Sequence, residues 1–480
     1  MWKLLYLSVN EWGNLGRRKP RLAYEFARQP QVASVLYVEP PVRTSLLDLL
    51  RGRFEPGHLG DRRRDHWAAL WGWLRPVEPK VWAYVGSTKA VPLTRFAALR
   101  RLSVLRRLNR AFYIARMRYA LRRLPGRRLI LWLTHPLQVF ALEAFPERAL
   151  LCYDWTDDWA EFDWLPVEDR QALIDWNDRI VREADLVFAV SESLARRARR
   201  LNPHVYRAPN ATDLTVIGRA SEPDGPIAPE IAALPRPVIG YIGQIADKMD
   251  YDLIAALAAA RPHWSFVFVG KVWANRQAEV EALAVRPNVH FLGFRPYEAL
   301  PDYLRGFDVC VIPHKVNALT RSMNPIKLFD YLATGKPIVS TSVAGVEAFA
   351  DVVRVADGPD AFVAALDAAL AEGDALRERR LAYARANAWP ARAAQMWRAI
   401  EERTHGTPSL AAGTSDDPSP LGAAPCAGRA PFGSSAGRPP SNLASEGDPG
   451  GQGPGAVGDE SPAGERQAAG RSILVGHLHR

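Results

Sequence analysis

Apolar and polar residues alternate in two distinct rhythms along most of this chain. Short apolar runs predict buried strands, and apolar positions that recur every three to four residues predict amphipathic helices. The predicted strands cover residues 3–9, 32–38, 129–134, 149–153, 185–190, 204–208, 237–242, 265–269, 289–292, 308–312, 337–340 and 352–355. The predicted helices between them include residues 19–28, 168–183, 192–201, 251–260, 275–283, 297–306, 325–334 and 359–370. This alternation predicts the α/β class, with doubly wound parallel sheets that bind ligands at the carboxyl ends of their strands.

Changes in composition divide the pattern into domains. A segment rich in proline, glycine and acids, residues 213–235, is the predicted linker between two Rossmann-like domains at 1–212 and 236–371. Helical residues continue over 372–404. The last 76 residues, 405–480, contain 15 glycines and 10 prolines, which together exceed the level of about 25–30% that is typical of disorder. We therefore expect this tail to have no fold.

Positive charge is concentrated in one region. The net charge is +10, and residues 95–128 contain twelve arginines and no acid, so the rest of the chain carries 10 − 12 = −2. With the basic, tryptophan-rich stretch before it, this region forms a predicted basic insertion at 51–128 in the first domain. Leu102, Leu105, Leu108 and Phe112 recur at helical spacing, which favours an amphipathic helix on an anionic membrane. The alternatives are the basic surface of a packed helix pair, or nucleic acid, for which no recognition motif is present.

The strongest local signal is the start of the predicted helix at 325–334. Asn324 is a good N-cap, Pro325 suits the first helical position, and Gly335 suits the left-handed position beyond the last turn. The helix would begin at the carboxyl end of a strand, where its free N–H groups favour a phosphate. Lys327 and Asp330 share one face of this helix, as a phosphate-binding cation and a ribose-binding carboxylate or as a solvated ion pair.

Cysteine content and hydropathy restrict the cellular compartment in which the protein would work. The three cysteines have neither the number nor the spacing of a disulfide framework or a metal site, which indicates a reducing compartment. Neither a signal peptide nor a membrane-spanning run is recognisable. We therefore expect a cytoplasmic protein.

Seven segments, taken in order and spacing, carry a resemblance. They are residues 131–136 (LWLTHP), 153–159 (YDWTDDW), 184–191 (ADLVFAVS), 209–213 (PNATD), 239–243 (IGYIG), 291–293 (FLG) and 324–341 (NPIKLFDYLATGKPIVST). On these segments the chain up to about residue 404 resembles the family 4-like bacterial glycosyltransferases of the GT-B fold, of the branch that makes cell-surface polysaccharides. The resemblance implies two Rossmann-like domains that face a cleft, with helices 372–404 crossing back onto the first.

The resemblance also implies where a nucleotide-sugar donor would bind. The donor-binding candidates are Gly243, Lys248, Asn324, Pro325, Lys327 and Asp330. The chain departs from the family in three places: Asp330 stands where a glutamate is usual, Ser322 stands where the family often has a second acid, and Gln244 stands where an arginine is common.

Residues that follow strands of the first domain are the other candidates. His135, either a loop histidine or a ligand of a sugar hydroxyl, is a candidate catalytic residue together with Lys248. One of Asp157 and Asp158 would act as base while the other caps or pairs, and Asp158 is the candidate. On the acceptor side the candidates are Asn14, Gly16 and Arg18, although Arg18 equally fits a surface helix.

These expectations define a hypothesis. The protein would transfer a sugar from a nucleotide-diphosphate donor to a hydroxyl of a lipid-linked saccharide or cell-surface polysaccharide, with retention of configuration and without a metal or other cofactor. It would work in the cytoplasm at the inner face of the cell membrane, touching anionic lipid through residues 95–128 and binding no nucleic acid. The alternative is an inactive GT-B-like module that binds nucleotide sugars or docks on membranes.

Overall fold

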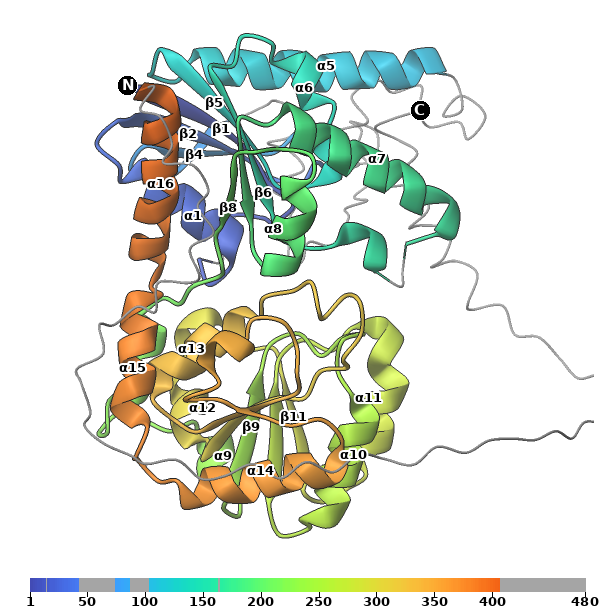
Figure 1. Ribbon diagram of the computed structural model, residues 1–480, viewed down its shortest axis with the longest axis vertical. Coiled ribbons are helices and arrows are strands. Elements are labelled where there is room, and N and C mark those ends of the chain that lie inside the picture. Colours follow the sequence, from blue (N-terminus) through green and yellow to red (C-terminus); the bar gives the residue numbers. More distant parts are fainter. Residues whose placement is uncertain (14, 43–73, 87–102, 163–164, 406–480) are drawn as a thin grey trace, which may run out of the picture.

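The computed structural model describes residues 1–13, 15–42, 74–86, 103–162 and 165–405. Asn14, Leu102, much of the predicted basic insertion and nearly all of the predicted tail therefore lie outside the described residues. Two α/β domains, each built on its own sheet, are stacked along the long axis of the molecule (Figure 1). The predicted α/β architecture of two doubly wound domains is confirmed.

The first domain contains an eight-stranded sheet in the order β3-β4-β2-β1-β5-β6-β7-β8. Its strands are β1 (Trp2–Leu7), β2 (Val32–Val38), β3 (Leu74–Glu78), β4 (Val81–Tyr84), β5 (Arg128–Leu133), β6 (Leu150–Trp155), β7 (Leu186–Ala189) and β8 (Val205–Arg207). All neighbours pair in parallel except β3, which runs antiparallel to β4 at the edge. This hairpin is not apparent from the sequence, because β3 is a half-exposed edge strand that contains Arg75 and Pro76 and lacks an apolar run.

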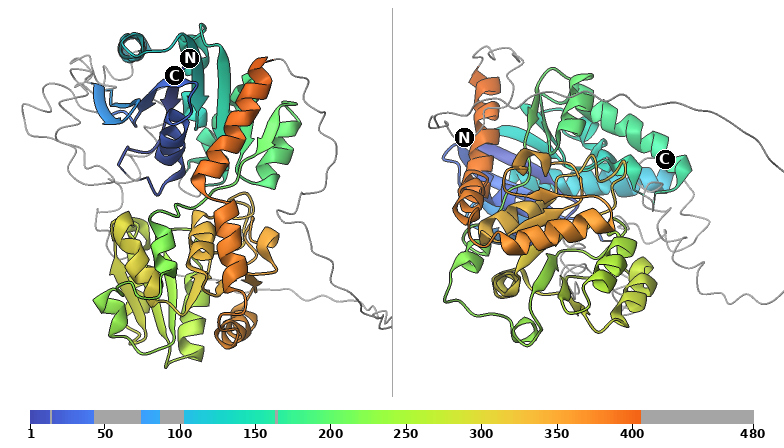
Figure 2. Two further views of the ribbon diagram at one scale, coloured as in Figure 1. Left: turned by 90° about the vertical axis from the view of Figure 1, so that its left-hand side faces the viewer. Right: turned by 60° about the horizontal axis from the view of Figure 1, so that its bottom comes forward.

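Helices cover both faces of this sheet. One face packs on α5 (Ser103–Arg122), α6 (Ala141–Ala144), α7 (Val167–Glu183) and α8 (Glu192–Arg199). The other face packs on α1 (Arg18–Ala27) and on α16 (Trp389–His405), which returns from the end of the described chain. Phe26 of α1 and Trp397 of α16 have ring centroids 6.0 Å apart, so α16 contributes to the core of the first domain (Figure 2).

The second domain contains a six-stranded parallel sheet in the order β11-β10-β9-β12-β13-β14. Its strands are β9 (Val238–Ile242), β10 (Ser265–Val269), β11 (Val289–Gly293), β12 (Val309–Ile312), β13 (Ile338–Ser340) and β14 (Arg354–Val355). One face packs on α9 (Pro229–Ala232), α12 (Leu300–Gly306), α13 (Ile326–Thr334) and α15 (Arg377–Ala386), and the other on α10 (Tyr251–Ala260), α11 (Gln277–Ala284) and α14 (Pro359–Ala371).

The chain crosses between the domains twice. The first crossing follows β8, and the predicted linker 213–235 then contains a 3-10 turn and α9, whose Ile217 and Ile231 are fully buried in the second domain. Most of this segment therefore belongs to the second core. The second crossing joins α15 to α16, where Ala388 forms a parallel bridge with Thr212 of the first crossing.

The carboxyl ends of strands from both sheets meet at the domain junction. Ser191, which follows β7, donates a hydrogen bond to the carbonyl of Ser322 in the loop before α13, at 2.6 Å. A site built from loops at strand ends would therefore draw residues from both domains. In the described part of the chain no helix is both long and apolar enough to cross a bilayer.

Candidate active site

Helix α13 begins at the domain junction, one residue later than the sequence suggests. Its first residue is Ile326, and Pro325 occupies the N-cap position without a side-chain bond. Asn324 does not cap the helix. Its Oδ1 accepts a hydrogen bond from the N–H of Asn210 at 2.8 Å, and its carbonyl accepts one from Nδ2 of the same residue at 2.6 Å. Asn324 therefore joins the domains. The N–H of Leu328 donates to the carbonyl of Pro325 at 3.1 Å, whereas the N–H groups of Ile326 and Lys327 have no acceptor among the described residues.

Lys327, in the first turn of α13, lies on the end of strand β9. Its Nζ is 4.8 Å from the ring centroid of Tyr241, and only 8% of the residue is exposed. Gly243 follows β9 with a φ of 130°, and a Cβ at that position would lie 3.1 Å from Cε and 3.2 Å from Nζ of the lysine. Glycine therefore allows the lysine to pack against the strand end.

Three positively charged or protonatable side chains of the second domain form the basic cluster: Lys248, His314 and Lys327. Burial, reinforced by the charge of Lys248, holds the pKa of Lys327 well below its usual value. Burial also lowers the pKa of Lys248. His314 is 1% exposed, and burial together with the two lysines holds its pKa well below 6.5, so its ring is neutral.

The basic cluster has no acidic ion-pair partner within 4.0 Å among the residues that the structure describes. Buried cations without a counter-ion are costly, since desolvation is not repaid by an ion pair. The electrostatics therefore favour an anion at the start of α13. His314 was not among the residues expected from the sequence, although its place two residues after the buried strand β12 was a signal.

His135 occupies the corresponding end of β5 in the first domain. Its Nδ1 accepts a hydrogen bond from the N–H of Leu137 at 3.0 Å, which places the ring proton on Nε2. Burial and the nearby charge of Lys19 lower its pKa to about 3. The ring centroid lies 4.2 Å from that of Trp159. His135 is therefore a neutral hydrogen-bond donor and a poor general base at neutral pH.

The two aspartates after β6 have different roles. Asp158 is buried in an ion pair with Arg197 of α8, whose guanidinium also lies 5.2 Å from the centroid of the Trp155 ring. This ion pair occupies the Asp158 carboxylate, which argues against the expected role of Asp158 as the base. Asp157 is half-buried, and its Oδ2 accepts a hydrogen bond from Thr156 at 2.8 Å.

Asp157 is also the acid that faces the second domain. Its charge raises the pKa of Lys19 in α1 and of Lys248 across the junction, opposing the effect of burial on both. Lys19 donates a hydrogen bond to the Thr156 hydroxyl at 3.3 Å. The structure thus moves the candidate for an acceptor-side carboxylate from Asp158 to Asp157.

Two acceptor-side candidates have structural contacts. Arg18 is buried in an ion pair with Asp154, at 2.7 Å between Nη2 and Oδ1, and also donates to the carbonyl of Pro209 at 3.0 Å. It is neither a surface residue nor available to an acceptor. Gly16 packs on Tyr297 of the second domain, whose ring a Cβ would approach to 2.4 Å. Asn14 lies outside the described residues.

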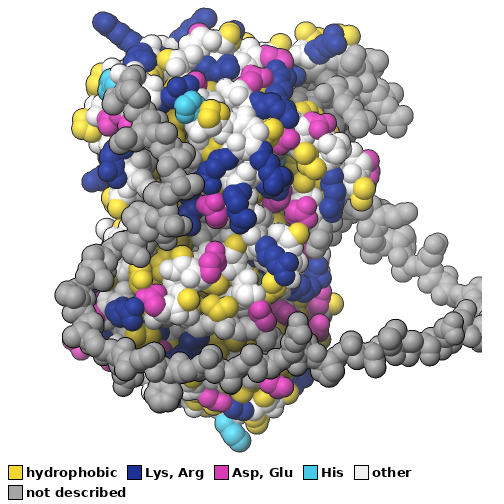
Figure 3. Space-filling view, in the orientation of Figure 1, with side chains coloured by type: hydrophobic (Ala, Val, Ile, Leu, Met, Phe, Trp, Pro, Cys, Tyr) yellow, Lys and Arg dark blue, Asp and Glu magenta, His cyan; other side chains and the backbone are white. Residues whose placement is uncertain are grey.

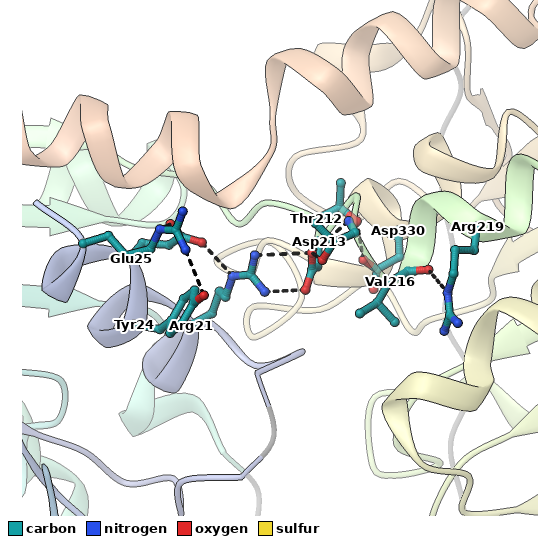
Figure 4. A network of polar contacts seen from close by, with 10 residues as sticks. Arg21, Tyr24, Glu25, Thr212, Asp213, Val216, Arg219 and Asp330 are labelled. Carbon is teal, nitrogen blue, oxygen red and sulfur yellow. Dashed lines mark hydrogen bonds and ion pairs between the residues drawn. The ribbon is translucent and has the colours of Figure 1, made fainter. Parts of the chain in front are cut away.

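Asp330 lies one turn into α13 and faces the first crossing between the domains. Its Oδ1 accepts a hydrogen bond from the Thr212 hydroxyl at 2.8 Å (Figure 4). Burial raises its pKa to about 7, with Thr212 and Lys327 lowering it and Asp213 raising it. The carboxyl is therefore close to half ionised at neutral pH, and its environment favours a partner that donates hydrogen bonds.

With this geometry in view, comparison with known proteins defines the class. Residues 236–372 match the family model of glycosyl transferases group 1. The chain is a glycosyltransferase of the GT-B fold, which confirms the resemblance and the enzyme class expected from the sequence.

Individual proteins similar to this chain have low sequence identity to it. The putative teichuronic acid biosynthesis glycosyltransferase TuaH of Bacillus subtilis is 26% identical over 290 residues, which cover 55% of this chain and 70% of that protein. Sucrose-phosphate synthase from Thermosynechococcus elongatus superimposes with a TM-score of 0.61 at 14% identity, covering 85% of this chain and all of that one. HepE of Anabaena, solved in complex with UDP, gives 0.56 at 14% identity, covering 84% of this chain and all of that one.

Proposed function

We propose that this protein transfers a sugar from a nucleoside-diphosphate sugar, with the diphosphate held at the start of α13. The observation that carries the proposal is the basic cluster, which combines buried positive charge with a helix start where the N–H groups of Ile326 and Lys327 have no acceptor among the described residues. The diphosphate would supply the missing counter-charge, and its bond to Lys327 would strengthen as negative charge develops on the leaving group.

The proposed reaction breaks the bond between the anomeric carbon and the diphosphate oxygen. The acceptor oxygen forms a new bond to the same carbon, and its proton passes to the departing diphosphate oxygen. Attack from the face that the leaving group vacates would retain the anomeric configuration. Nε2–H of His135 would bind a sugar hydroxyl, and Asp157 would orient the acceptor. Positive charge from the lysines would make a metal or other cofactor unnecessary.

The donor and the acceptor are proposed from two sources. UDP in the HepE complex makes a uridine diphosphate sugar the first donor to test. The relative in teichuronic acid biosynthesis supports an acceptor that is a lipid-linked saccharide or a growing cell-surface polysaccharide.

The test is a thermal-shift screen of the full chain against UDP-, GDP- and ADP-sugars, followed by detection of free nucleoside diphosphate in the presence of lipid-linked saccharide extracts. The proposal predicts a higher melting temperature with one nucleotide class and acceptor-dependent release of that nucleotide. Absence of binding to all three classes would refute it.

An inactive nucleotide-sugar-binding module is the second candidate. Ser322 replaces the upstream acid of the family, and its hydroxyl bonds the carbonyl of Leu319 at 2.8 Å rather than pointing to a free site. Donor binding without turnover across a broad panel of acceptors would favour this module.

Membrane contact through α5 is proposed on the shape of that helix. Its inner side packs Tyr113, Met117 and Leu121 into the core, whereas a second apolar row on its outer side is exposed: Val104, Leu108, Phe112 and Tyr119. Arginines flank this row, and Arg116 and Arg123 lie over the rings of Phe112 and Tyr119, at 5.2 and 5.8 Å from their centroids. An exposed apolar row between cations fits an anionic bilayer surface, at about 1 kcal/mol for each cation.

The arrangement of the helices supports this contact. Helix α5 runs along the edge of the first domain farthest from the second (Figures 1 and 2), and Lys and Arg side chains are frequent over the first domain on the face in view (Figure 3). The protein would then work in the cytoplasm at the inner face of the cell membrane.

Vesicle sedimentation tests the membrane contact. We expect binding to phosphatidylglycerol vesicles, little binding to phosphatidylcholine vesicles, and loss of binding in Leu108→Glu/Phe112→Glu. Val285→Glu, at an exposed apolar residue of the second domain, is the control and should bind as the wild type does. Equal binding to both lipids would contradict the proposal.

A further inference from the structure

The carboxyl of Asp330 is held in an unusual way for a buried acid. The residue is only 5% exposed, and its one hydrogen bond from the described residues is donated by Thr212 to Oδ1. Buried carboxylates normally accept several hydrogen bonds. Here the second oxygen, Oδ2, accepts no hydrogen bond from the part of the chain that the structure describes.

Thr212, which supplies that bond, is itself fixed from both sides. It is fully buried, its N–H donates to the carbonyl of Asn387 at 3.1 Å, and its carbonyl accepts from the N–H of Trp389 at 3.1 Å. Both partners belong to the second crossing of the chain. The backbone of Thr212 is thus held by hydrogen bonds to the second crossing, which fixes the position of its hydroxyl.

Asp213, the next residue, connects this pair of segments to the first domain. Asp213 forms a two-pronged ion pair with Arg21 of α1, with Nη2 and Oδ1 at 3.3 Å, and Arg21 also bonds Glu25 at 3.0 Å (Figure 4). The side chains that make these contacts are buried except for a few per cent of their surface: Arg21, Glu25, Thr212 and Asp213. The position of Thr212 therefore depends on contacts with α1 as well as with α15 and α16.

We infer that Thr212 is a positioning residue for donor binding: its hydroxyl holds one oxygen of Asp330 so that the other meets the ribose hydroxyls of the nucleotide. This inference rests on the proposed function and adds to it a residue outside the donor-contacting set. Holding Oδ1 fixes the rotation of the carboxyl group, so less conformational freedom remains to be lost when the nucleotide binds.

The surroundings of Asp330 determine how its ionisation would respond. Lys327 on the same helix favours the carboxylate, as does the hydrogen bond from Thr212, whereas Asp213 opposes it. Tyr297, from the turn beside Gly16, also faces this group, and Arg21 lies behind Asp213. Removing the Thr212 hydroxyl should therefore raise the pKa of Asp330 and move the acidic limb of donor binding to higher pH.

Comparison of Thr212→Val with Thr212→Ser tests the inference, using titration calorimetry of the full chain with UDP across a pH series. UDP stands here for whichever nucleoside diphosphate the wild type binds. We expect Thr212→Val to weaken binding about tenfold at neutral pH and to shift the acidic limb upward, and Thr212→Ser to restore both. If Thr212→Val does not fold, Thr212→Ala removes the same hydroxyl with less change in shape.

A 2′,3′-dideoxynucleoside diphosphate separates positioning from general damage. Without ribose hydroxyls, wild type and Thr212→Val should bind this analogue equally. An equal loss for both nucleotides, or a Thr212→Val that binds the full nucleotide with wild-type affinity and pH dependence, would overturn the inference. A wild type that binds no nucleoside diphosphate would instead refute the proposed function.

Discussion

The buried charged residues on the two sides of the domain junction differ in how many of them have ion-pair partners. On the first-domain side the buried charges Arg18, Arg21 and Asp158 have ion-pair partners, which are Asp154, Asp213 and Arg197. Lys19, also buried on that side, forms no ion pair within the described residues and instead donates a hydrogen bond to the Thr156 hydroxyl. On the second-domain side the two lysines of the basic cluster, Lys248 and Lys327, have no acidic partner within ion-pair distance among the described residues. The paired charges stabilise the fold, and we propose that the unpaired lysines bind a ligand of negative charge.

This contrast has an energetic reason. A buried ion pair repays much of its desolvation penalty through the attraction of its members, whereas a lone buried cation does not. A chain that retains such cations has a lower folding stability, and binding of an anion would offset this cost. Variants on the two sides should therefore fail in opposite ways.

The largest effect should come from a paired charge. Arg18→Met would leave Asp154 buried without its partner, and we expect the free energy of unfolding to fall by about 3–5 kcal/mol. Urea denaturation measures this change. At low temperature the folded fraction should still bind the nucleotide, and wild-type stability in this variant would break the comparison.

The next effect should come from an unpaired charge. Lys327→Met should weaken nucleoside-diphosphate binding about 100-fold, about 2–3 kcal/mol, because the diphosphate loses its charge-assisted bond. The melting temperature should be unchanged or higher, since a desolvated cation is removed. Lys336→Met is the matched control at the opposite end of α13, where burial also lowers the pKa of the lysine, and it should bind normally.

Asp330 should link stability to pH. Because folding raises its pKa to about 7, the folded chain keeps a proton that the unfolded chain releases near pH 4. This contribution to stability is complete at low pH and is lost as the pH rises through about 7. Relative to Asp330→Asn, the wild type should lose about 2 kcal/mol between about pH 5 and 8.

Denaturation curves of both proteins at several pH values measure the difference. In the same variant, nucleotide binding should be weaker, since an amide offers one acceptor where a carboxylate offers two. Parallel stability curves for the two proteins would show that Asp330 ionises normally in the fold.

The smallest effect should come from His135. His135→Phe removes the Nε2–H donor, and turnover should fall about tenfold, or about 1–2 kcal/mol, while nucleotide binding is unchanged. With a pKa of about 3 the imidazole stays neutral in the working range, so the pH–rate profile of the variant should keep its shape. A lost basic or acidic limb in steady-state kinetics would contradict this role.

Local patterns in the sequence predicted most of the second domain. Strand and helix positions there follow runs of apolar residues and strong turn signals, and Gly243, Lys327 and Asp330 could be selected because they lie at the ends of such elements. The start of α13 was wrong by one residue because Asn324 uses its side chain on Asn210, 114 positions earlier in the chain.

The differences between expectation and structure in the first domain have the same origin. Whether Asp157 or Asp158 is free depends on Arg197, 39 positions away, and whether Arg18 is free depends on Asp154, 136 positions away. Neither partner is visible to periodicity or local spacing. The sequence therefore indicates which residue types stand at strand ends, and only the tertiary fold decides which of them are already occupied.

The bridge between Thr212 and Ala388 has a mechanical consequence. Because both crossings of the chain lie side by side and are hydrogen-bonded there, any rotation of one domain against the other would take place about a common line through these crossings. Rotation of the domains about that line would change separations least near Asp330, which Thr212 contacts, and more at positions farther from the two crossings. A nucleotide anchored near that line could therefore stay bound while the far side opens to exchange one saccharide for the next.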